Sequence, residues 1–203
     1  ITVRKTIKVK NTFSSLNNLA QITRDTTSAK IVGITGSVGK TTLKNLVSFA
    51  LARYGKVYCS PHSYNNKFGV PLSLANLKKN TEFGIFEIGM DKKGEIETLS
   101  KIVKPEIGII TNVAEAHFKN FNSLKDIAKA KAEIISNISD NGHIILNKDD
   151  KFFSFFSNIA KSKNLNIISF GFNKTADISL ISIKKNKKKN ILKGRVKGKF
   201  FYF

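Results

Sequence analysis

The chain has 203 residues, 41% of them hydrophobic, which is enough for one globular domain and part of another. Its single cysteine, Cys59, excludes an internal disulfide framework and is typical of a reducing compartment, and no apolar run reaches the roughly 18 residues of a membrane-spanning helix. Only four of the 35 basic residues are arginines and the lysines are spread along the chain, so the net charge of +21 indicates a compositional bias rather than a nucleic-acid groove.

The chain begins with a basic, alternating stretch at residues 1–10 and continues with a polar segment at 11–29, in which a short helix is predicted near 15–22. At the other end, residues 199–203 are typical of a strand that stops midway. We therefore interpret the sequence as a fragment of a longer protein.

From residue 30 onward, short apolar runs alternate with segments of helical periodicity. The predicted elements are strand 30–35, helix 40–53, strand 56–59, helix 70–77, strand 83–88, helix 94–103, strand 106–111, helix 123–138, strand 143–147, helix 150–161 and strand 166–170.

After residue 177 the pattern changes to three short strands without helices, at 178–183, 191–197 and 199–203. The alternating part predicts an α/β fold with a mainly parallel sheet flanked by helices, and the last strands predict an antiparallel extension of it. A lysine cluster at 184–189 is predicted to be a solvated hairpin tip, with an anionic partner as the alternative.

The strongest motif follows the first strand and opens a helix: residues 33–42 read Gly-Ile-Thr-Gly-Ser-Val-Gly-Lys-Thr-Thr. Glycines let backbone N–H groups curl around phosphates, and the helix N-terminus adds partial positive charge. In such a loop Lys40 contacts the β- and γ-phosphates of ATP and the Thr41 hydroxyl ligates Mg²⁺. The predicted nucleotide-binding residues are Gly36, Ser37, Val38, Gly39, Lys40, Thr41 and Thr42.

The glycine spacing of this motif differs from the general phosphate-loop pattern. Gly33 leaves five residues before Gly-Lys and Gly36 leaves two, and the general spacing falls between these values. A glycine turn that only caps a helix is the alternative, but Gly-Lys-Thr-Thr directly after a strand favours a phosphate loop.

The phosphate loop and four later segments of the sequence resemble those of the Mur ligase family and its folate-adding relatives. The resemblance lies in Thr-Gly-Ser-Val-Gly-Lys-Thr-Thr at 35–42, Asn-Asn-Lys-Phe-Gly-Val-Pro at 65–71, Phe-Glu-Ile-Gly-Met at 86–90, Thr-Asn-Val-Ala-Glu-Ala-His at 111–117 and Ala-Lys-Ala-Lys-Ala-Glu-Ile at 128–134. The segment at 65–71 is similar to that of the members that add D-alanyl-D-alanine.

The resemblance implies that residues 1–29 end an N-terminal UDP-substrate domain, that 30–203 form most of a central ATP-binding domain, and that a C-terminal domain is absent. It implies an ATP-dependent ligase, with ATP and two Mg²⁺ ions as cofactors, that acts in peptidoglycan precursor synthesis. The carboxylate of UDP-N-acetylmuramoyl tripeptide would be activated as an acyl phosphate and joined to the amine of D-alanyl-D-alanine.

Candidate metal ligands follow two of the predicted strands. Glu87 lies at the carboxyl end of strand 83–88, at the sheet edge that also holds the phosphate loop. Mg²⁺ prefers few carboxylates plus phosphate oxygens, so Glu87 and Thr41 form the predicted first site. His117 follows strand 106–111, and the resemblance implies that it ligates a second Mg²⁺.

Lys131 is predicted to point inward, with the apolar face of its helix. A buried ammonium is costly unless it is paired or neutral, so it either reaches a carboxylate at the surface or, as the resemblance implies, is carbamylated by CO₂ and ligates the second Mg²⁺. Lys129 is predicted to be solvated. The neighbours of Lys131 three and four residues away are Ile127, Ala128, Ile134 and Ile135. The predicted catalytic residues are Lys40, Glu87, His117 and Lys131.

Asn65 and Asn66 precede a Gly-Val-Pro turn, and either serve that turn or position the substrate near the γ-phosphate. The remaining alternatives are a related ligase that adds a single amino acid, a P-loop ATPase that binds nucleic acid, and a fragment that only binds nucleotide weakly. The few arginines and the lack of an aromatic stacking motif argue against nucleic acid. We expect a cytoplasmic monomer whose partners are the two ligase substrates, without nucleic acid or membrane.

Overall fold

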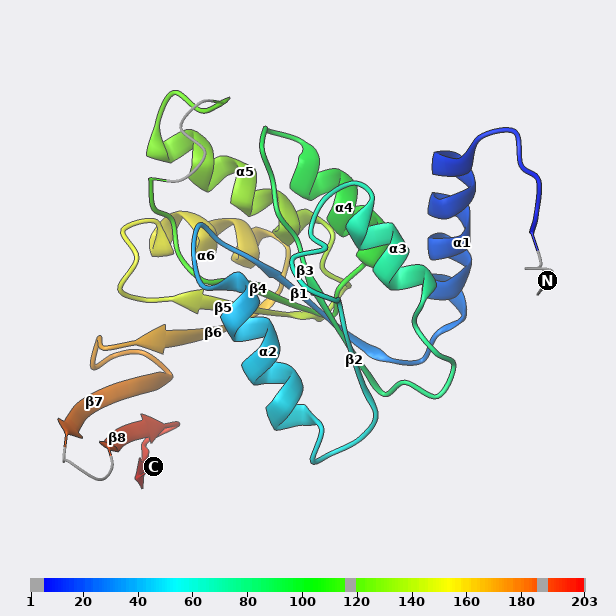
Figure 1. Cartoon of the computed structure of the whole chain (residues 1–203). Helices are drawn as coiled ribbons and strands as arrows, with labels where there is room; N and C mark the ends of the chain where they lie inside the picture. Colours follow the sequence, from blue (N-terminus) through cyan, green and yellow to red (C-terminus); the bar gives the residue numbers. More distant parts are fainter. Residues whose placement is uncertain (1–5, 116–119, 186–189, 203) are drawn as a thin grey trace.

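The computed structural model describes residues 6–115, 120–185 and 190–202. Within them one sheet runs through the molecule in the order β2-β3-β1-β4-β5-β6-β7-β8-β9 (Figure 1). All neighbouring strands from β2 to β7 pair in parallel, and β7-β8 and β8-β9 pair antiparallel. The strands are β1 Lys30–Thr35, β2 Val57–Cys59, β3 Phe83–Glu87, β4 Ile107–Ile110, β5 His143–Asn147, β6 Asn166–Gly171, β7 Ile178–Lys185, β8 Asn190–Val196 and β9 Lys199–Tyr202.

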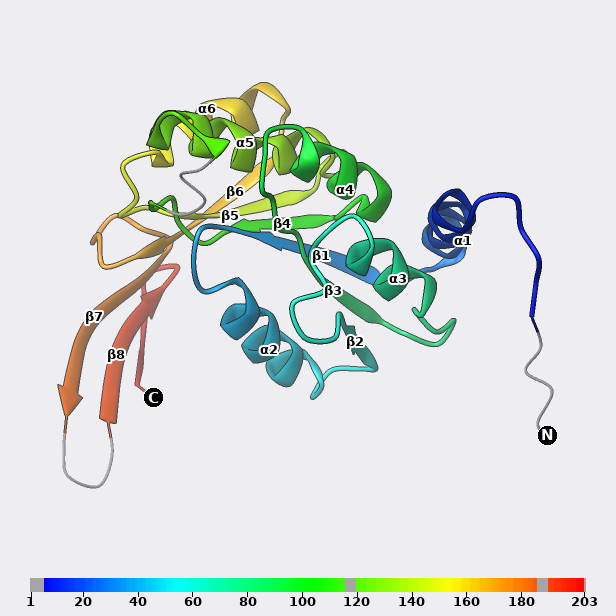
Figure 2. The same cartoon turned by 45° about the horizontal axis from the view of Figure 1, so that its top comes forward.

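Helices cover both faces of the parallel part of the sheet, and Figure 2 shows α2 on one face with α3, α4, α5 and α6 on the other. The face under α2 buries Val32, Ile34 and Ile85, whereas the opposite face carries the larger core. Helix α1 packs beside α3, away from the strands. The helices are α1 Thr12–Thr26, α2 Lys40–Leu51, α3 Gly69–Ala75, α4 Glu95–Val103, α5 Leu124–Ser136 and α6 Phe153–Ser162.

This architecture confirms the predicted α/β class and the antiparallel extension at residues 178–202. The largest difference in bounds is at the first helix, which spans Thr12–Thr26 rather than 15–22 because Asn11 caps it by accepting the Ser14 N–H at 2.8 Å. Helix α5 is also capped, since the Ser123 hydroxyl oxygen accepts the Asp126 N–H at 3.2 Å.

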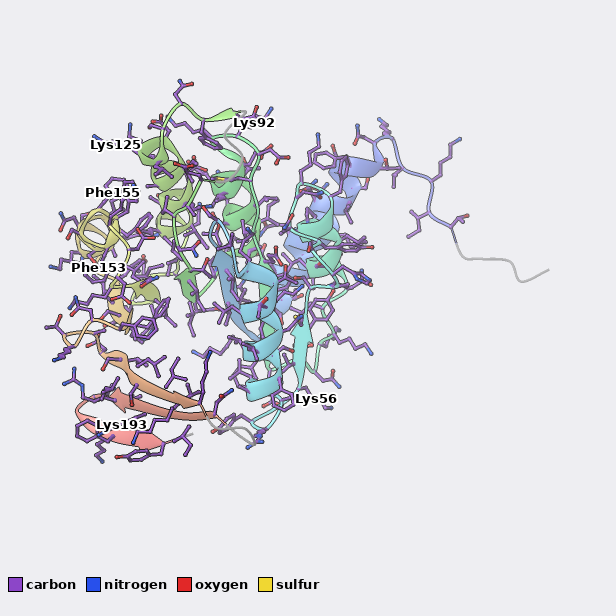
Figure 3. All side chains as sticks on the ribbon, turned by 60° about the vertical axis from the view of Figure 1, so that its left-hand side comes forward. Lys56, Lys92, Lys125, Phe153, Phe155 and Lys193 are labelled. Atoms are coloured by element: carbon purple, nitrogen blue, oxygen red, sulfur yellow. The ribbon has the colours of Figure 1, made fainter. Side chains whose placement is uncertain are left out.

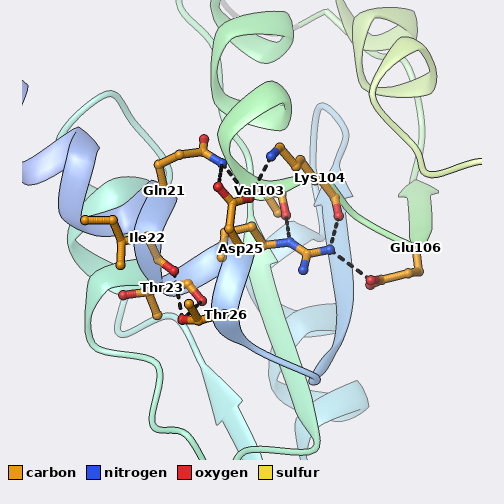
Figure 4. A network of polar contacts seen from close by, with 9 residues as sticks. Gln21, Ile22, Thr23, Asp25, Thr26, Val103, Lys104 and Glu106 are labelled. Carbon is orange, nitrogen blue, oxygen red and sulfur yellow. Dashed lines mark hydrogen bonds and ion pairs between the residues drawn. The ribbon is translucent and has the colours of Figure 1, made fainter.

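Helix α1 is fixed to the amino ends of the strands by Arg24 (Figure 4). Its guanidinium donates to the carbonyls of Val103 at 2.7 Å and Lys104 at 2.6 Å, and pairs with Glu106 at 2.8 Å. The other Glu106 oxygen accepts the N–H of Ile31, the second residue of β1, at 2.5 Å. One arginine therefore connects α1 to α4, to β1 and to the segment that enters β4.

Lysines are distributed over the whole molecule, and Figure 3 labels Lys56, Lys92, Lys125 and Lys193 in well-separated parts of it. Lys184 and Lys185 are exposed at the end of β7, as a solvated hairpin requires, and the rest of that predicted cluster lies outside the described residues.

Candidate nucleotide and metal site

The candidate site lies where β1, β3 and β4 end side by side. Because these strands are parallel, with Ile34 opposite Glu87 and Thr35 opposite Ile110, their following loops meet at one sheet edge. The edge receives the phosphate loop from β1, Glu87 from β3 and residues 111–114 from β4.

The phosphate loop has the backbone that its glycines predict. Gly36 has a φ of 149° and Gly39 a φ of 83°, and a Cβ on Gly36 would lie 1.7 Å from the Thr111 hydroxyl oxygen. The loop ends in the first turn of α2, whose N–H groups have no partner within the helix and form a site for anions.

The segment after β4 holds the phosphate loop in this shape. Asn112 accepts the Ser37 N–H with its backbone oxygen at 3.0 Å and the Val38 N–H with its side-chain oxygen at 3.1 Å. The Thr111 hydroxyl donates to the Val38 carbonyl at 2.7 Å. Sequence reasoning assigned no role to Asn112, although it lies within the family-like segment at 111–117.

Lys40 folds back over the loop and donates to the Gly36 carbonyl at 2.7 Å. Partial burial lowers the pKa of this ammonium, an effect that the negative charge of Glu87 opposes. The Lys40 ammonium is therefore held beside the loop, and its contact with a bound phosphate stays a prediction.

Glu87 is buried, with 2% of its surface exposed, and two of the predicted residues donate to it. The Thr41 hydroxyl donates to one carboxylate oxygen at 2.7 Å, and the Asn65 amide donates to the other at 2.7 Å. The predicted proximity of Thr41 and Glu87 is thus present, and Asn65 joins them. A buried carboxylate beside a hydroxyl and a phosphate loop is a donor set that suits Mg²⁺.

Asn66 differs from its neighbour. Its side-chain oxygen accepts the N–H groups of Phe68 at 3.1 Å and Gly69 at 3.0 Å, so it forms the turn that starts α3. The turn alternative describes Asn66, and a role of Asn66 in substrate binding stays a prediction.

Lys131 is buried as predicted, with 2% of its surface exposed. Burial, followed by repulsion from Lys40, lowers the pKa of Lys131 to about 7. Within the described part of the chain this ammonium forms no hydrogen bond or ion pair. Lys129, on the same helix, has a half-exposed side chain 3.6 Å from Asp126, as the solvated interpretation predicts.

A cavity of about 560 Å³ opens in front of this site, between the phosphate loop and helices α1, α3 and α4. Lys40 and Lys131 are among the residues that line it. The lining residues are Phe13, Gly36, Lys40, Asn65, Asn66, Lys67, Phe68, Gly89, Met90, Asp91, Glu95, Thr98, Leu99 and Lys131. The cavity is therefore lined by cationic and aromatic side chains together with residues of the phosphate loop.

Sequence reasoning missed Lys44, which is 1% exposed. Its ammonium donates to the Ser60 carbonyl at 2.7 Å and to the His62 carbonyl, and lies 3.9 Å from a Glu87 oxygen. Its burial could have been predicted from its position in the helix. Lys44 lies four residues after Lys40 and three before Val47, on the face of α2 that packs on the sheet.

His117 lies outside the described residues, so its predicted metal role stays a prediction. Among the residues that are described, no group of three or more His, Cys, Asp or Glu side chains could hold a metal ion by itself.

The Mur ligase middle domain family matches residues 34–201, and the chain belongs to this family. Among curated relatives, it is 40% identical over 181 residues to the UDP-N-acetylmuramoyl-tripeptide--D-alanyl-D-alanine ligase of Rickettsia prowazekii, covering 89% of this chain and 40% of the relative. The enzyme of the same name from Escherichia coli is 35% identical over 142 residues, which are 70% of this chain and 31% of the relative.

Solved structures agree with this assignment. MurF from Acinetobacter baumannii superposes with a TM-score of 0.88 at 29% identity, covering 97% of this chain and 43% of that one. The MurF ligase from Thermotoga maritima in complex with ADP superposes with a TM-score of 0.86 at 27% identity, covering 98% and 47%. The chain therefore spans less than half the length of the relatives that it resembles.

Proposed function

We propose that this chain supplies the ATP-binding part of a ligase that joins UDP-N-acetylmuramoyl tripeptide to D-alanyl-D-alanine. The observation that carries the proposal is the convergence of the phosphate loop, the buried Glu87 and the buried Lys131 at one edge of the sheet. The names of the relatives supply the two substrates.

We assign residues 1–29 to the end of a substrate domain and residues 30–203 to the central ATP-binding domain. The matched region, 34–201, supports the second assignment. Among the described residues no helix has the length and apolarity to span a bilayer. We propose a cytoplasmic location, because both of the proposed substrates are water-soluble precursors, and we propose that the protein acts as a monomer.

The fit of Mg²⁺ to the site rests on the buried Glu87 carboxylate and the Thr41 hydroxyl that touches it. Bound Mg²⁺ would neutralise charge on the phosphate oxygens. For a second ion we propose His117 and the carbamate of Lys131. A pKa of about 7 supports carbamylation, because the neutral amine is the form that reacts with CO₂.

The first step is phosphoryl transfer. In this proposal the first turn of α2 and Lys40 hold the β- and γ-phosphates, and the tripeptide carboxylate enters through the cavity that Lys40 lines. A carboxylate oxygen of the tripeptide forms a bond to the γ-phosphorus while the bond from that phosphorus to the β–γ bridging oxygen breaks. The products are an acyl phosphate and ADP, and Lys40 stabilises the charge that moves onto the phosphate oxygens.

The second step forms the amide. The amine of D-alanyl-D-alanine attacks the acyl carbon, the tetrahedral intermediate expels inorganic phosphate, and the amine proton passes to solvent. The chain needs no nucleophilic side chain for either step, since the substrate carboxylate and the substrate amine are the nucleophiles.

The test is release of phosphate from ATP by the full-length protein that contains this sequence, with each substrate omitted in turn. Release that requires both substrates supports the ligase. Release with a single amino acid in place of the dipeptide indicates a different member of the family. Release that needs neither but is stimulated by nucleic acid contradicts the proposal.

In the same assay, Lys40→Ala tests the phosphate loop, because it removes the proposed contact with the phosphates. We expect its turnover to fall by about 100-fold or more, while Lys78→Ala, at an exposed position, keeps the rate. A near-normal rate for Lys40→Ala would remove the phosphate-loop assignment.

A further inference from the structure

Lys44 is one of the two most deeply buried lysines among the described residues, and the mechanism above does not use it. It lies one turn after Lys40 on α2 but, unlike Lys40, does not line the cavity. Its ammonium points to the segment after β2, where it donates to the carbonyls of Ser60 and His62. It therefore cannot act as a second phosphate contact from that position.

The segment that Lys44 holds leads directly to Asn65. His62 has a φ of 44°, a left-handed conformation that is unfavourable for a residue other than glycine and needs support from its surroundings. Asn65 itself is closely fitted, since its backbone oxygen accepts the Gly89 N–H at 2.8 Å and a Cβ on Gly89 would lie 2.8 Å from its amide carbon. Anchoring residues 60–62 thus determines where the Asn65 amide meets Glu87.

Lys44 also supplies charge. Its ammonium lies 3.9 Å from the Glu87 oxygen that accepts the Thr41 hydroxyl, and both charged side chains are almost fully buried. A carboxylate buried without a positive charge nearby is strongly destabilising. Lys44 therefore supplies the positive charge that holds the buried Glu87 carboxylate in place when no cation is bound.

We propose that Lys44 is a positioning residue that balances the charge of Glu87 and anchors the segment before Asn65, so that the Thr41–Glu87–Asn65 cluster is formed before the metal–nucleotide complex arrives. The inference rests on the proposed function only in taking Glu87 as the carboxylate that meets the metal. It predicts that Mg²⁺ compensates part of what is lost when Lys44 is replaced.

The experiment compares Lys44→Met, Lys44→Arg and the exposed control Lys79→Met in the full-length protein. Thermal unfolding midpoints are measured with ADP alone and with ADP plus MgCl₂. With ADP alone, we expect Lys44→Met to melt lower than Lys79→Met by roughly 10 °C. Adding MgCl₂ should raise the midpoint of Lys44→Met by more degrees than that of the wild type, and Lys44→Arg should lie between the two.

A merely structural lysine would lower the midpoint without changing the increment due to MgCl₂, so equal increments in Lys44→Met and wild type would overturn the proposal. An unchanged midpoint would overturn it as well. These readouts need no ligase turnover, so they separate this inference from the proposed function, which the phosphate-release assay of the wild type decides.

If Lys44→Met does not fold, the variant Lys44→Met/Glu87→Gln is compared with Glu87→Gln alone. Charge balance predicts that the double variant folds, because the buried carboxylate is gone. A double variant that remains unfolded while Glu87→Gln folds would overturn the role of Lys44 in balancing Glu87.

Discussion

Three lysines around the phosphate loop have three different surroundings. Lys40 donates to a loop carbonyl, Lys44 lies beside a buried carboxylate, and Lys131 is buried without a partner among the described residues. We therefore propose three different roles for the same side chain: a phosphate contact at Lys40, a fixed counter-charge at Lys44 and a site of neutralisation at Lys131. Which of these it becomes depends on the acidic or carbonyl oxygens within its reach.

The proposed carbamate of Lys131 can be detected directly. With ¹³C-bicarbonate, we expect one protein-bound carbamate carbon in the NMR spectrum of the full-length protein, because the pKa of about 7 leaves much of the amine neutral at neutral pH. Lys131→Met should lose the signal, and Lys129→Met, which changes an exposed lysine of the same helix, should keep it. A signal that survives in Lys131→Met would place the carbamate elsewhere.

In buffer free of CO₂, Lys131 makes stability depend on pH. Its pKa falls from 10.5 in the unfolded chain to about 7 in the folded one, so between these values the folded chain binds fewer protons. The free energy of unfolding should rise with pH across this window, by up to about 1.4 kcal/mol per pH unit. Denaturant unfolding of Lys131→Met should lack the rise, which Lys129→Met retains; a rise of equal size in Lys131→Met would contradict the assignment.

At this scale the sequence predicted the residues whose chemistry follows from a strand end or a helix face. Thr41, Glu87 and Lys131 are examples, and the structure brings Thr41 and Glu87 into contact. The sequence did not show that Asn65 contacts Glu87 whereas Asn66 forms a turn. The direction of each side chain depends on the turn that leads into α3. The burial of Lys44 was not predicted, because a lysine near apolar positions of a helix usually reaches solvent. The carbonyls that accept hydrogen bonds from its ammonium belong to a segment outside α2.

At the scale of elements, the loop after β4 determines the shape of the loop after β1. Asn112 accepts the N–H groups of both Ser37 and Val38, so the phosphate loop is held before nucleotide binds. We expect Asn112→Ala to weaken binding of ADP by roughly tenfold, which corresponds to the loss of one such hydrogen bond. Calorimetric titration against the exposed control Asn80→Ala measures this, and unchanged affinity would show that the loop holds its shape alone.

Helix α1 depends on one partly buried arginine network. Arg24→Ala leaves the carbonyls of Val103 and Lys104 and the carboxylate of Glu106 without their donor, so we expect the free energy of unfolding to fall by about 2–4 kcal/mol. The control is Asp25→Ala, which breaks the exposed pair with Lys104 and should leave the denaturation midpoint nearly unchanged. Equal losses in both variants would mean that the position of α1 depends on the whole network.

Periodicity predicted these elements well where one face meets the core and less well elsewhere. In α2, the apolar Leu46 is 60% exposed, whereas the charged Lys44 is 1% exposed and occupies a buried position. Helix α1 was predicted too short, since its polar sequence carries little periodic signal and its docking depends on Arg24. Such long-range contacts cannot be derived from local patterns.

At the scale of the whole molecule, the candidate site lies at the carboxyl ends of β3, β1 and β4, the second to fourth strands of the nine-stranded sheet, and α1 and the β7–β9 strands lie at opposite ends of the molecule (Figure 1). The antiparallel strands expose several large apolar side chains, among them Ile181, Ile183 and Phe200. The sequence predicted the order of strands and helices but not the register, which requires the packing of both faces at once.

The charge of +21 allows a last prediction about the molecule as a whole. Lysines that are spread over the surface attract polyanions only at low salt, because screening shortens their reach to about 8 Å at physiological ionic strength. We expect fluorescence anisotropy to show binding of single-stranded DNA or RNA at low salt that disappears near 0.15 M salt, roughly the physiological value. Nucleic acid should also leave ATP hydrolysis unchanged. If binding persists at this salt and nucleic acid also speeds ATP hydrolysis, the excess of lysines serves nucleic-acid binding. That result would favour a nucleic-acid-dependent ATPase over a ligase.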